Sequence, residues 1–235
     1  MKNKNEFLSI AQIYSSWATS LKVEDIPKSV IDKLNTIVMD SMGLMISAQR
    51  EPYIQSLVKA LNEKGDCSLI GHDKKVSPFN ASIVNGTAIH GEDFDDTFEG
   101  TPVHVGAVMV PAMLASVQAR NLSGNDLLKG LAIGSELICR LALVAPTAVH
   151  RQGFHPTAIF GAFGASIGIS SAIGSSMNQM VNSLGIVGSM ASGIIEYLAE
   201  GTSTKRLHPG WAAGCGWQSA NIAQSGFIGP RTVFE

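Results

Sequence analysis

Residues 158–174, AIFGAFGASIGISSAIG, decide the fold class of this chain. A helix formed by this stretch would be apolar or small around its whole circumference, which is typical of a helix that is buried on all sides. Small residues lie four positions apart in two pairs, Gly161 with Ala165 and Gly164 with Gly168. Because glycine carries no side chain, such pairs would let the backbones of neighbouring helices approach closely. The stretch therefore predicts a buried helix packed tightly against other helices.

The charge-free region around that stretch could suggest a membrane span. Residues 156–195 contain no Asp, Glu, Lys or Arg, but glycines and polar side chains interrupt them, among them Asn178, Gln179 and Asn182. A spanning helix needs about 20 predominantly apolar residues. We therefore expect two buried helices joined near residues 174–177, and no membrane association.

Helix signals recur along the rest of the chain. Ser77 precedes Pro78, a pairing typical of a helix start, because serine caps well and proline fits the first helical position. Ser123 and Asp126 form a capping-box pattern, and the helix that follows is expected to end at about Val144. One short strand-like run occurs, CSLI, and strands do not alternate with helices. The predicted fold class is all-α, a multi-helix bundle.

The composition fits a single α-helical domain over residues 1–235. With 45% hydrophobic and 15% charged residues, the chain can bury a core, and its low charge suggests further surface hidden in an oligomer. A net charge of −2 offers no basic patch for nucleic acid. Three widely spaced cysteines speak against a disulfide framework or a zinc site, which favours a reducing, cytoplasmic location.

Acidic side chains gather in residues 85–107, NGTAIHGEDFDDTFEGTPVHVGA, although the chain around them is apolar. Carboxylates rarely lie in apolar surroundings unless they are paired or used, because removing them from water is costly. If the preceding helix continued through this stretch, Asp93 and Thr97 would lie on one face with Asp96 beside them. They would then be placed to bind a polar substrate or move a proton. Alternatively, Asp95 or Asp96 caps a following turn and the other acids face solvent.

A divalent metal is a further interpretation of the same acids. The pattern Asp-x-Asp-Asp offers the hard oxygen ligands that Mg²⁺ prefers. No second carboxylate motif completes such a site, so we expect neither a metal nor another cofactor. Loss of activity on adding EDTA would support the alternative, a metal-dependent hydrolase that uses residues 93–96.

Two histidines and one lysine lie in settings that suit anionic ligands. His104 stands close before a glycine and an apolar helix, and His155 directly precedes the buried helix. A helix N-terminus carries partial positive charge and free N–H groups, which bind anions and bring a nearby imidazole into the acid–base range. Lys205, in a turn rich in Gly, Thr and Ser, offers a carboxylate-binding nest. The alternatives are structural histidines and a solvated loop lysine.

Five segments resemble, in their order along the chain, the MmgE/PrpD family, which includes 2-methylcitrate dehydratase, cis-aconitate decarboxylase and iminodisuccinate epimerase. They are NGTAIHGEDFDDT (85–97), VHVGAVMVPAMLA (103–115), GFHPTAIFGAFGAS (153–166), GTSTKRLHPGWAA (201–213) and GFIGPRTVFE (226–235). The resemblance implies a metal-independent homodimer with a large α-helical domain, which longer relatives join to a smaller α+β lid. We therefore expect this chain to be the N-terminal half, with the lid half absent or separately encoded.

By the same resemblance, the family's active-site positions correspond here to Asp93, Thr97, His104, His155 and Lys205. We expect Lys205 and His155 to hold substrate carboxylates and Thr97 to orient a carboxylate or hydroxyl. Asp93 or His104 would then transfer the proton at the carbon next to a carboxylate. One extra residue precedes His104 relative to some relatives, and a valine follows it where many have proline.

These expectations lead to two hypotheses of different class. The first is a lyase for small di- or tricarboxylates, most specifically a hydro-lyase of the 2-methylcitrate dehydratase type. Decarboxylation of the cis-aconitate kind and epimerisation are its alternatives. The second hypothesis is a catalytically incomplete helical fragment that serves in dimerisation. A neighbouring reading frame that encodes the lid half would favour the first.

Overall fold

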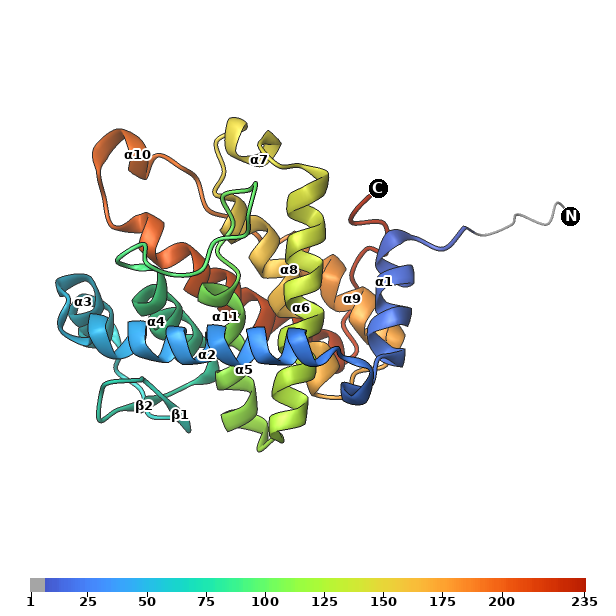
Figure 1. Cartoon of the computed structure of the whole chain (residues 1–235), viewed down its shortest axis with the longest axis horizontal. Helices are drawn as coiled ribbons and strands as arrows, with labels where there is room; N and C mark the ends of the chain where they lie inside the picture. Colours follow the sequence, from blue (N-terminus) through green and yellow to red (C-terminus); the bar gives the residue numbers. More distant parts are fainter. Residues whose placement is uncertain (1–6) are drawn as a thin grey trace, which may run out of the picture.

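The computed structural model describes residues 7–235, which form a mostly helical chain (Figure 1). In chain order the elements are α1 (Ile10–Ser20), the 3-10 helix η1 (Val23–Asp25), α2 (Lys28–Ser47), the 3-10 helix η2 (Ala48–Arg50), α3 (Pro52–Ala60), β1 (Cys67–Ser68), β2 (Lys75–Val76), α4 (Pro78–His90), α5 (Gly106–Arg120), α6 (Gly124–Val144), α7 (Ala148–Arg151), α8 (Pro156–Ala172), α9 (Met177–Gly188), α10 (Tyr197–Glu200) and α11 (Thr204–Gln224). The strand-like run forms half of a short antiparallel hairpin, in which Cys67 pairs with Val76. The predicted all-α class is confirmed, since this hairpin is the only sheet in the described part of the chain.

Helix α8 forms the centre of the bundle, as its sequence predicts. It packs against α5, α6, α9 and α11, and Figure 1 shows α6 passing in front of it. Every residue of α8 except Ile159 is buried. Helix α9 follows after a short turn, so the expected pair of helices in the charge-free region is confirmed. Within residues 7–235, none of the helices combines the length and the apolar character that crossing a bilayer requires.

The predicted helix boundaries agree with the structure where capping residues mark them. Ser77 caps α4, because its Oγ atom accepts the N–H of Asn80 at 3.3 Å. Ser123 and Asp126 cap α6 reciprocally, each side chain accepting a backbone N–H of the other residue, and α6 ends at Val144. Short-range hydrogen bonding therefore sets these boundaries.

Helices α6 and α8 touch through their backbones at paired glycines. A Cβ atom on Gly134 would lie 2.6 Å from the carbonyl oxygen of Gly164, and one on Gly164 would lie 2.7 Å from that of Gly134. One turn along, Gly130 and Gly168 repeat the arrangement, with distances of 2.8 and 2.6 Å. A real side-chain carbon does not fit so close to backbone atoms in a packed interior. The close approach expected from Gly164 and Gly168 is confirmed.

Replacing Gly134 by alanine is expected to lower the free energy of unfolding by about 1–3 kcal/mol, because the new methyl group overpacks the contact between α6 and α8. The matched control is Gly43→Ala in α2, where a Cβ atom meets nothing within 4 Å. There, alanine should stabilise the chain by up to about 1 kcal/mol through its higher helix propensity. Urea unfolding followed by circular dichroism measures both variants. Shifts of the same sign and size would contradict the backbone contact.

A second close crossing arranges the helix ends around the candidate site. A Cβ atom on Gly86 in α4 would lie 2.6 Å from the Cα atom of Gly210 in α11. Helix α11 therefore packs closely along α4, and it also packs along α8. The C-terminal end of α4 and the N-terminal ends of α8 and α11 carry His90, His155 and Lys205, respectively.

Candidate active site

The acidic stretch forms a loop, residues 91–105, between α4 and α5. Helix α4 ends at His90, and Asp93 has a φ of 60°, in the left-handed region that is unfavourable for residues other than glycine. The helix therefore does not continue through this stretch, and Asp93 and Thr97 do not share a helix face. As a loop, the stretch turns several side chains toward the ends of α8 and α11.

Two hydrogen bonds fix the path of this loop. The Oδ1 atom of Asp96 accepts the N–H of Gly106, the first residue of α5, at 2.9 Å. The N–H of His104 donates to Oγ1 of Thr157 in the first turn of α8, at 3.1 Å. Asp96 thus satisfies the first N–H of α5, but the alternative in which the remaining acids face solvent is wrong, because Asp95 is buried. Its neighbour Asp95 has different partners.

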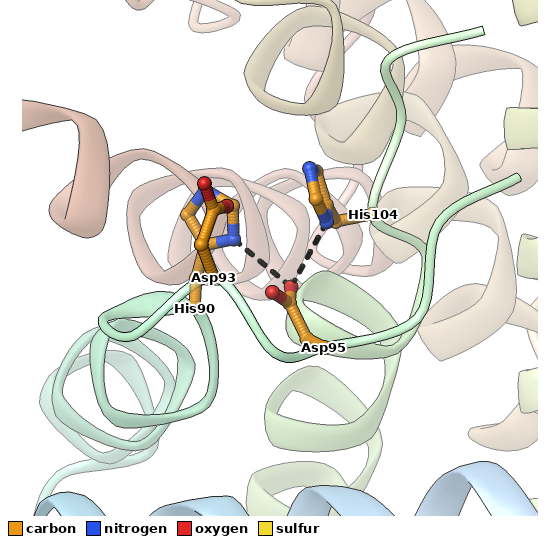
Figure 2. Close-up of side chains that lie close together, drawn as sticks. All are labelled: His90, Asp93, Asp95 and His104. Atoms are coloured by element: carbon orange, nitrogen blue, oxygen red, sulfur yellow. Dashed lines mark hydrogen bonds and ion pairs between the residues drawn. The ribbon is translucent and has the colours of Figure 1, made fainter.

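Asp95 lies between two imidazoles and contacts both of them (Figure 2). Its Oδ2 atom accepts hydrogen bonds from Nδ1 of His90 at 2.9 Å and from Nδ1 of His104 at 3.3 Å. Asp95 is only 6% exposed, and burial by itself would raise its pKa. The two imidazole hydrogen bonds outweigh burial and hold the pKa well below its usual range, so Asp95 is an anion. Because a carboxylate anion only accepts, both imidazoles carry a proton on Nδ1.

The two imidazoles that share Asp95 differ in their tendency to bind a second proton. His90 is completely buried at the end of α4, and burial lowers its pKa in spite of Asp95. For His104, burial also works against protonation, but the hydrogen bond and charge of Asp95 outweigh it and raise the pKa. The Nδ1 atom of His104 also lies 3.4 Å from Oγ1 of Thr97. Of these two imidazoles, His90 therefore stays neutral, whereas His104 can be protonated.

Helix α11 contributes a cation to the same site. Lys205 lies in its first turn, and its ammonium forms an ion pair with Oδ1 of Asp93. Partial burial would raise the pKa of Asp93, but Lys205 outweighs it and keeps the pKa low. The next residue, Arg206, donates from Nε to the carbonyl oxygen of Gly91 at 2.7 Å and ties the loop to α11. The alternative of a solvated loop lysine is wrong, because Lys205 is helical and paired.

His155 occupies the N-terminal cap of α8, as its place in the sequence predicts. Its ring stacks on that of His90, with centroids 5.7 Å apart, and its Nδ1 atom lies 3.2 Å from Nδ1 of His208 in α11. Burial holds the pKa of His155 far below its usual range and lowers that of His208 to about 4. Contacts thus connect His155 to His90, and through Asp95 to His104.

Three members of this cluster are not among the residues predicted from the sequence: His90, Asp95 and His208. A signal existed for His208, since it lies three positions after Lys205 and so shares its helix face. For Asp95 the signal was general, because a carboxylate inside an apolar fold requires partners and two histidines lie within the same fifteen positions. All five predicted residues belong to this one cluster of contacts.

A cation is one possible occupant of the cluster. The ligand atoms of His90, Asp93, Asp95 and His104 lie within 4.8 Å of one another. Each of these groups already has a partner inside the cluster or in Lys205. A metal ion bound through the Nδ1 atoms would have to displace their protons, and a metal ion bound through any of these groups would face the ammonium of Lys205. The groups fit a carboxylate–imidazole network better than a metal site, and the absence of a metal stays a prediction.

The buried imidazoles predict that the fold loses stability in acid. The pKa values of His155 and His208 are lowered in the fold, so below their ordinary value of 6.5 the unfolded chain binds protons that the folded chain excludes. The free energy of unfolding should therefore fall as the pH drops below 6.5, by about 1.4 kcal/mol per pH unit for the buried His155. Thermal unfolding measured from neutral pH to about pH 4 tests this. A midpoint that does not move would contradict it.

The sequence is similar to one family of proteins along nearly its whole length. A family model described as the MmgE/PrpD N-terminal domain matches residues 12–235. The chain is 28% identical over 231 residues to the cis-aconitate decarboxylase-like protein oryM of Aspergillus oryzae, covering 94% of this chain and 48% of that protein. It is 25% identical over 228 residues to cis-aconitate decarboxylase of Aspergillus terreus, with coverage of 93% and 46%. It is 30% identical over 236 residues to cis-aconitate decarboxylase of Homo sapiens, covering 97% of this chain and 48% of that protein.

The chain thus spans about half the length of the curated relatives it matches. The family match, by contrast, extends over all but the first eleven residues. The loop between α4 and α5 and the first turns of α8 and α11, which build the cluster, all fall within it. This protein therefore belongs to the MmgE/PrpD family.

Proposed function

We propose that this chain carries the carboxylate-binding and proton-transfer groups of a lyase that acts on small di- or tricarboxylates. The observation that supports this most strongly is the Asp95–His104 pair, because a buried anion raises the pKa of a slightly exposed imidazole. Such an imidazolium can donate a proton near neutral pH. The carboxylate of Asp93 lies within 4.8 Å of that imidazole and is paired with Lys205, so a cation, an anion and a proton donor are adjacent.

Positive potential for binding the substrate comes from Lys205 and from two helix ends. Lys205 lies in the first turn of α11, and His155 caps α8. Free N–H groups and the helix dipole at such ends attract anions. In the proposed complex, one substrate carboxylate accepts a hydrogen bond from Lys205 and a second accepts one from His155. The hydroxyl of Thr97 orients the substrate group nearest His104.

The same groups suit either of two reactions at a carbon next to a carboxylate. In decarboxylation, the bond from carbon to one carboxylate breaks, CO₂ leaves, and the electron pair left on carbon takes the proton of His104. In dehydration, Asp93 takes a proton from carbon while His104 protonates the leaving hydroxyl, which departs as water. Both reactions leave His104 neutral, and the anion Asp95 favours its reprotonation.

The relatives named above favour decarboxylation of cis-aconitate as the specific activity. Dehydration of the 2-methylcitrate type is the second candidate. It is supported by the five segments that resemble the family and by the short distance between Asp93 and the proton donor His104. Since the chain spans about half of these relatives, we assign the activity to the complete protein. In this proposal the chain acts in a cytoplasmic homodimer together with a lid half, whether joined to it or separately encoded.

The direct test is an assay of the purified chain, alone and mixed with any polypeptide that corresponds to the second half of these relatives. Isothermal titration calorimetry measures the binding of cis-aconitate and 2-methylcitrate, and proton NMR follows their conversion. The proposal expects binding of at least one of them, with conversion when both halves are present. If neither acid binds and neither is converted, the catalytically incomplete dimerisation fragment is the better description.

Replacing Lys205 by methionine is expected to weaken tricarboxylate binding by roughly 10- to 100-fold, the range for loss of one charge-assisted hydrogen bond. Methionine keeps the length and helix propensity of the side chain, and the carboxylate of Asp93 left behind is 59% exposed, so the fold should persist. The matched control is Lys28→Met, which breaks the exposed ion pair with Asp32 in α2. Calorimetric titration compares the two variants, and equal affinities would contradict the role of Lys205.

A further inference from the structure

His155 and His208 form a buried pair that the proton transfer described above does not use. The residues are 3% and 8% exposed, and their Nδ1 atoms lie 3.2 Å apart. His155 is the N-terminal cap of α8, and His208 lies in the second turn of α11. At this separation one Nδ1 atom carries a proton and donates a hydrogen bond to the other Nδ1 atom. Two lone pairs or two N–H groups facing each other would repel. The contact therefore links the tautomers of the two rings.

The positions of the two rings are held independently of this proton. The backbone N–H of His155 donates to the carbonyl oxygen of Gly193 at 2.8 Å. Gly193 also lies against His208, since a Cβ atom there would be 3.3 Å from its Nδ1 atom. The ring of Tyr197 meets both imidazoles edge-on, with centroids 6.0 Å from His155 and 5.7 Å from His208. These contacts do not determine which of the two Nδ1 atoms carries the proton.

We propose that His208 is a positioning residue, whose Nδ1–H donates to Nδ1 of His155 and so keeps the proton of His155 on Nε2. This inference rests on the proposed function, because the expected ligand is a carboxylate, which accepts hydrogen bonds and donates none. Among residues 7–235, Nε2 of His155 has no hydrogen-bond partner. With its proton on Nδ1, His155 would present a lone pair to the substrate and repel it. With His208 as donor, it presents an N–H.

Nitrogen-15 NMR of the histidine-labelled chain tests the tautomers without any substrate. Two-bond proton–nitrogen spectra distinguish protonated from unprotonated ring nitrogens, and single substitutions assign the signals of the six histidines. We expect His155 in the Nε2–H form and His208 in the Nδ1–H form. The reverse assignment, or averaged ring signals for His155, would overturn the proposal.

Two variants of His208 separate positioning from packing. In His208→Leu, the signals of His155 should move to the averaged values of an imidazole with no fixed tautomer. In His208→Asn, the amide NH₂ takes the place of the Nδ1–H donor, so His155 should keep its proton on Nε2. If a folded His208→Leu chain leaves the tautomer of His155 unchanged, His208 does not position it. If that variant does not fold, the wild-type and asparagine spectra still decide the question.

Binding of cis-aconitate then separates this inference from the proposed function. His208→Leu should weaken binding by about 3- to 10-fold, the effect of one hydrogen bond, and His208→Asn should restore most of the loss. Equal weakening in both variants would overturn the positioning role. If the wild-type tautomers are as expected but no tricarboxylate binds, the proposed function fails and the direction of the hydrogen bond is upheld.

Discussion

Replacing Asp95 by asparagine is expected to lower kcat/KM for the tricarboxylate substrate by roughly 10²- to 10⁴-fold, the range for loss of general acid–base catalysis. Both imidazoles contact the same oxygen, Oδ2, so the amide oxygen of asparagine can take its place, but the NH₂ group then lies where Oδ1 has no hydrogen-bond partner among the described residues. His104 also loses the negative charge that raises its pKa, and therefore loses the proton that it would donate.

The matched control is Asp96→Asn, at the next position in the chain. Asp96 accepts one hydrogen bond, from the N–H of Gly106, and an asparagine oxygen can accept the same bond. This variant should keep an activity close to that of the wild type. Histidine NMR titration adds a measurement that needs no turnover: the pKa of His104 should fall in Asp95→Asn and stay raised in Asp96→Asn. Equal losses of activity, or a His104 pKa that ignores Asp95→Asn, would contradict the role of Asp95.

Replacing His104 by alanine is expected to reduce kcat/KM by a similar factor, roughly 10²- to 10⁴-fold. The other imidazoles cannot take over the proton donation, because burial lowers the pKa values of His90 and His155 and keeps them neutral. In the wild type, kcat/KM should fall as the pH rises through the raised pKa of His104, because only the protonated ring donates. In His104→Ala that alkaline decrease should disappear.

Steady-state kinetics over a range of pH values, with cis-aconitate as substrate, test the assignment of His104. The matched control is His150→Ala, a histidine of α7 that lies outside the cluster. It should leave both the rate and the pH profile unchanged. Turnover by His104→Ala at the wild-type rate, or an alkaline decrease that survives the substitution, would identify another group as the proton donor.

Helix α8 shows why much of the fold follows from the sequence. Its apolar composition predicts that it is buried, and the spacing of Gly164 and Gly168 predicts its tight contact with another helix. The caps at Ser77 and Ser123 act over three residues, so their effect is visible in a short window. Each of these features depends on interactions within one element or on the size of single side chains.

The path of the loop formed by residues 91–105 could not be predicted from the sequence. The pattern of side chains permits the helix to continue past His90, and nothing in the local sequence requires Asp93 to adopt a left-handed conformation. The hydrogen bonds that fix the path of the loop, and the burial of Asp95 between His90 and His104, are created by the tertiary structure. The five site residues could therefore be named through the family resemblance, but the hub that connects them could not.

Helix α11 gives a second example of tertiary structure overriding a local signal. The residues around Lys205 look like a turn, and Pro209 within them is a helix breaker. The structure nevertheless continues the helix through Pro209, which packs α11 along α4 and α8. Proline has no N–H, so the carbonyl of Lys205 has no helical donor at position 209. This continuation places His208 opposite His155, 53 positions away in the chain.

The glycine contact between α6 and α8 also limits how this protein can be evolved or engineered. Helix α8 is almost completely buried and has His155 as its N-terminal cap, so the same helix belongs to the core and to the candidate site. A larger residue at Gly134 requires compensating space on α8, the helix whose N-terminal cap is His155. Stabilising substitutions selected at this contact should therefore be screened for ligand binding as well as for thermal stability. Position 43 of α2, where a Cβ atom meets nothing within 4 Å, offers stabilisation away from this contact.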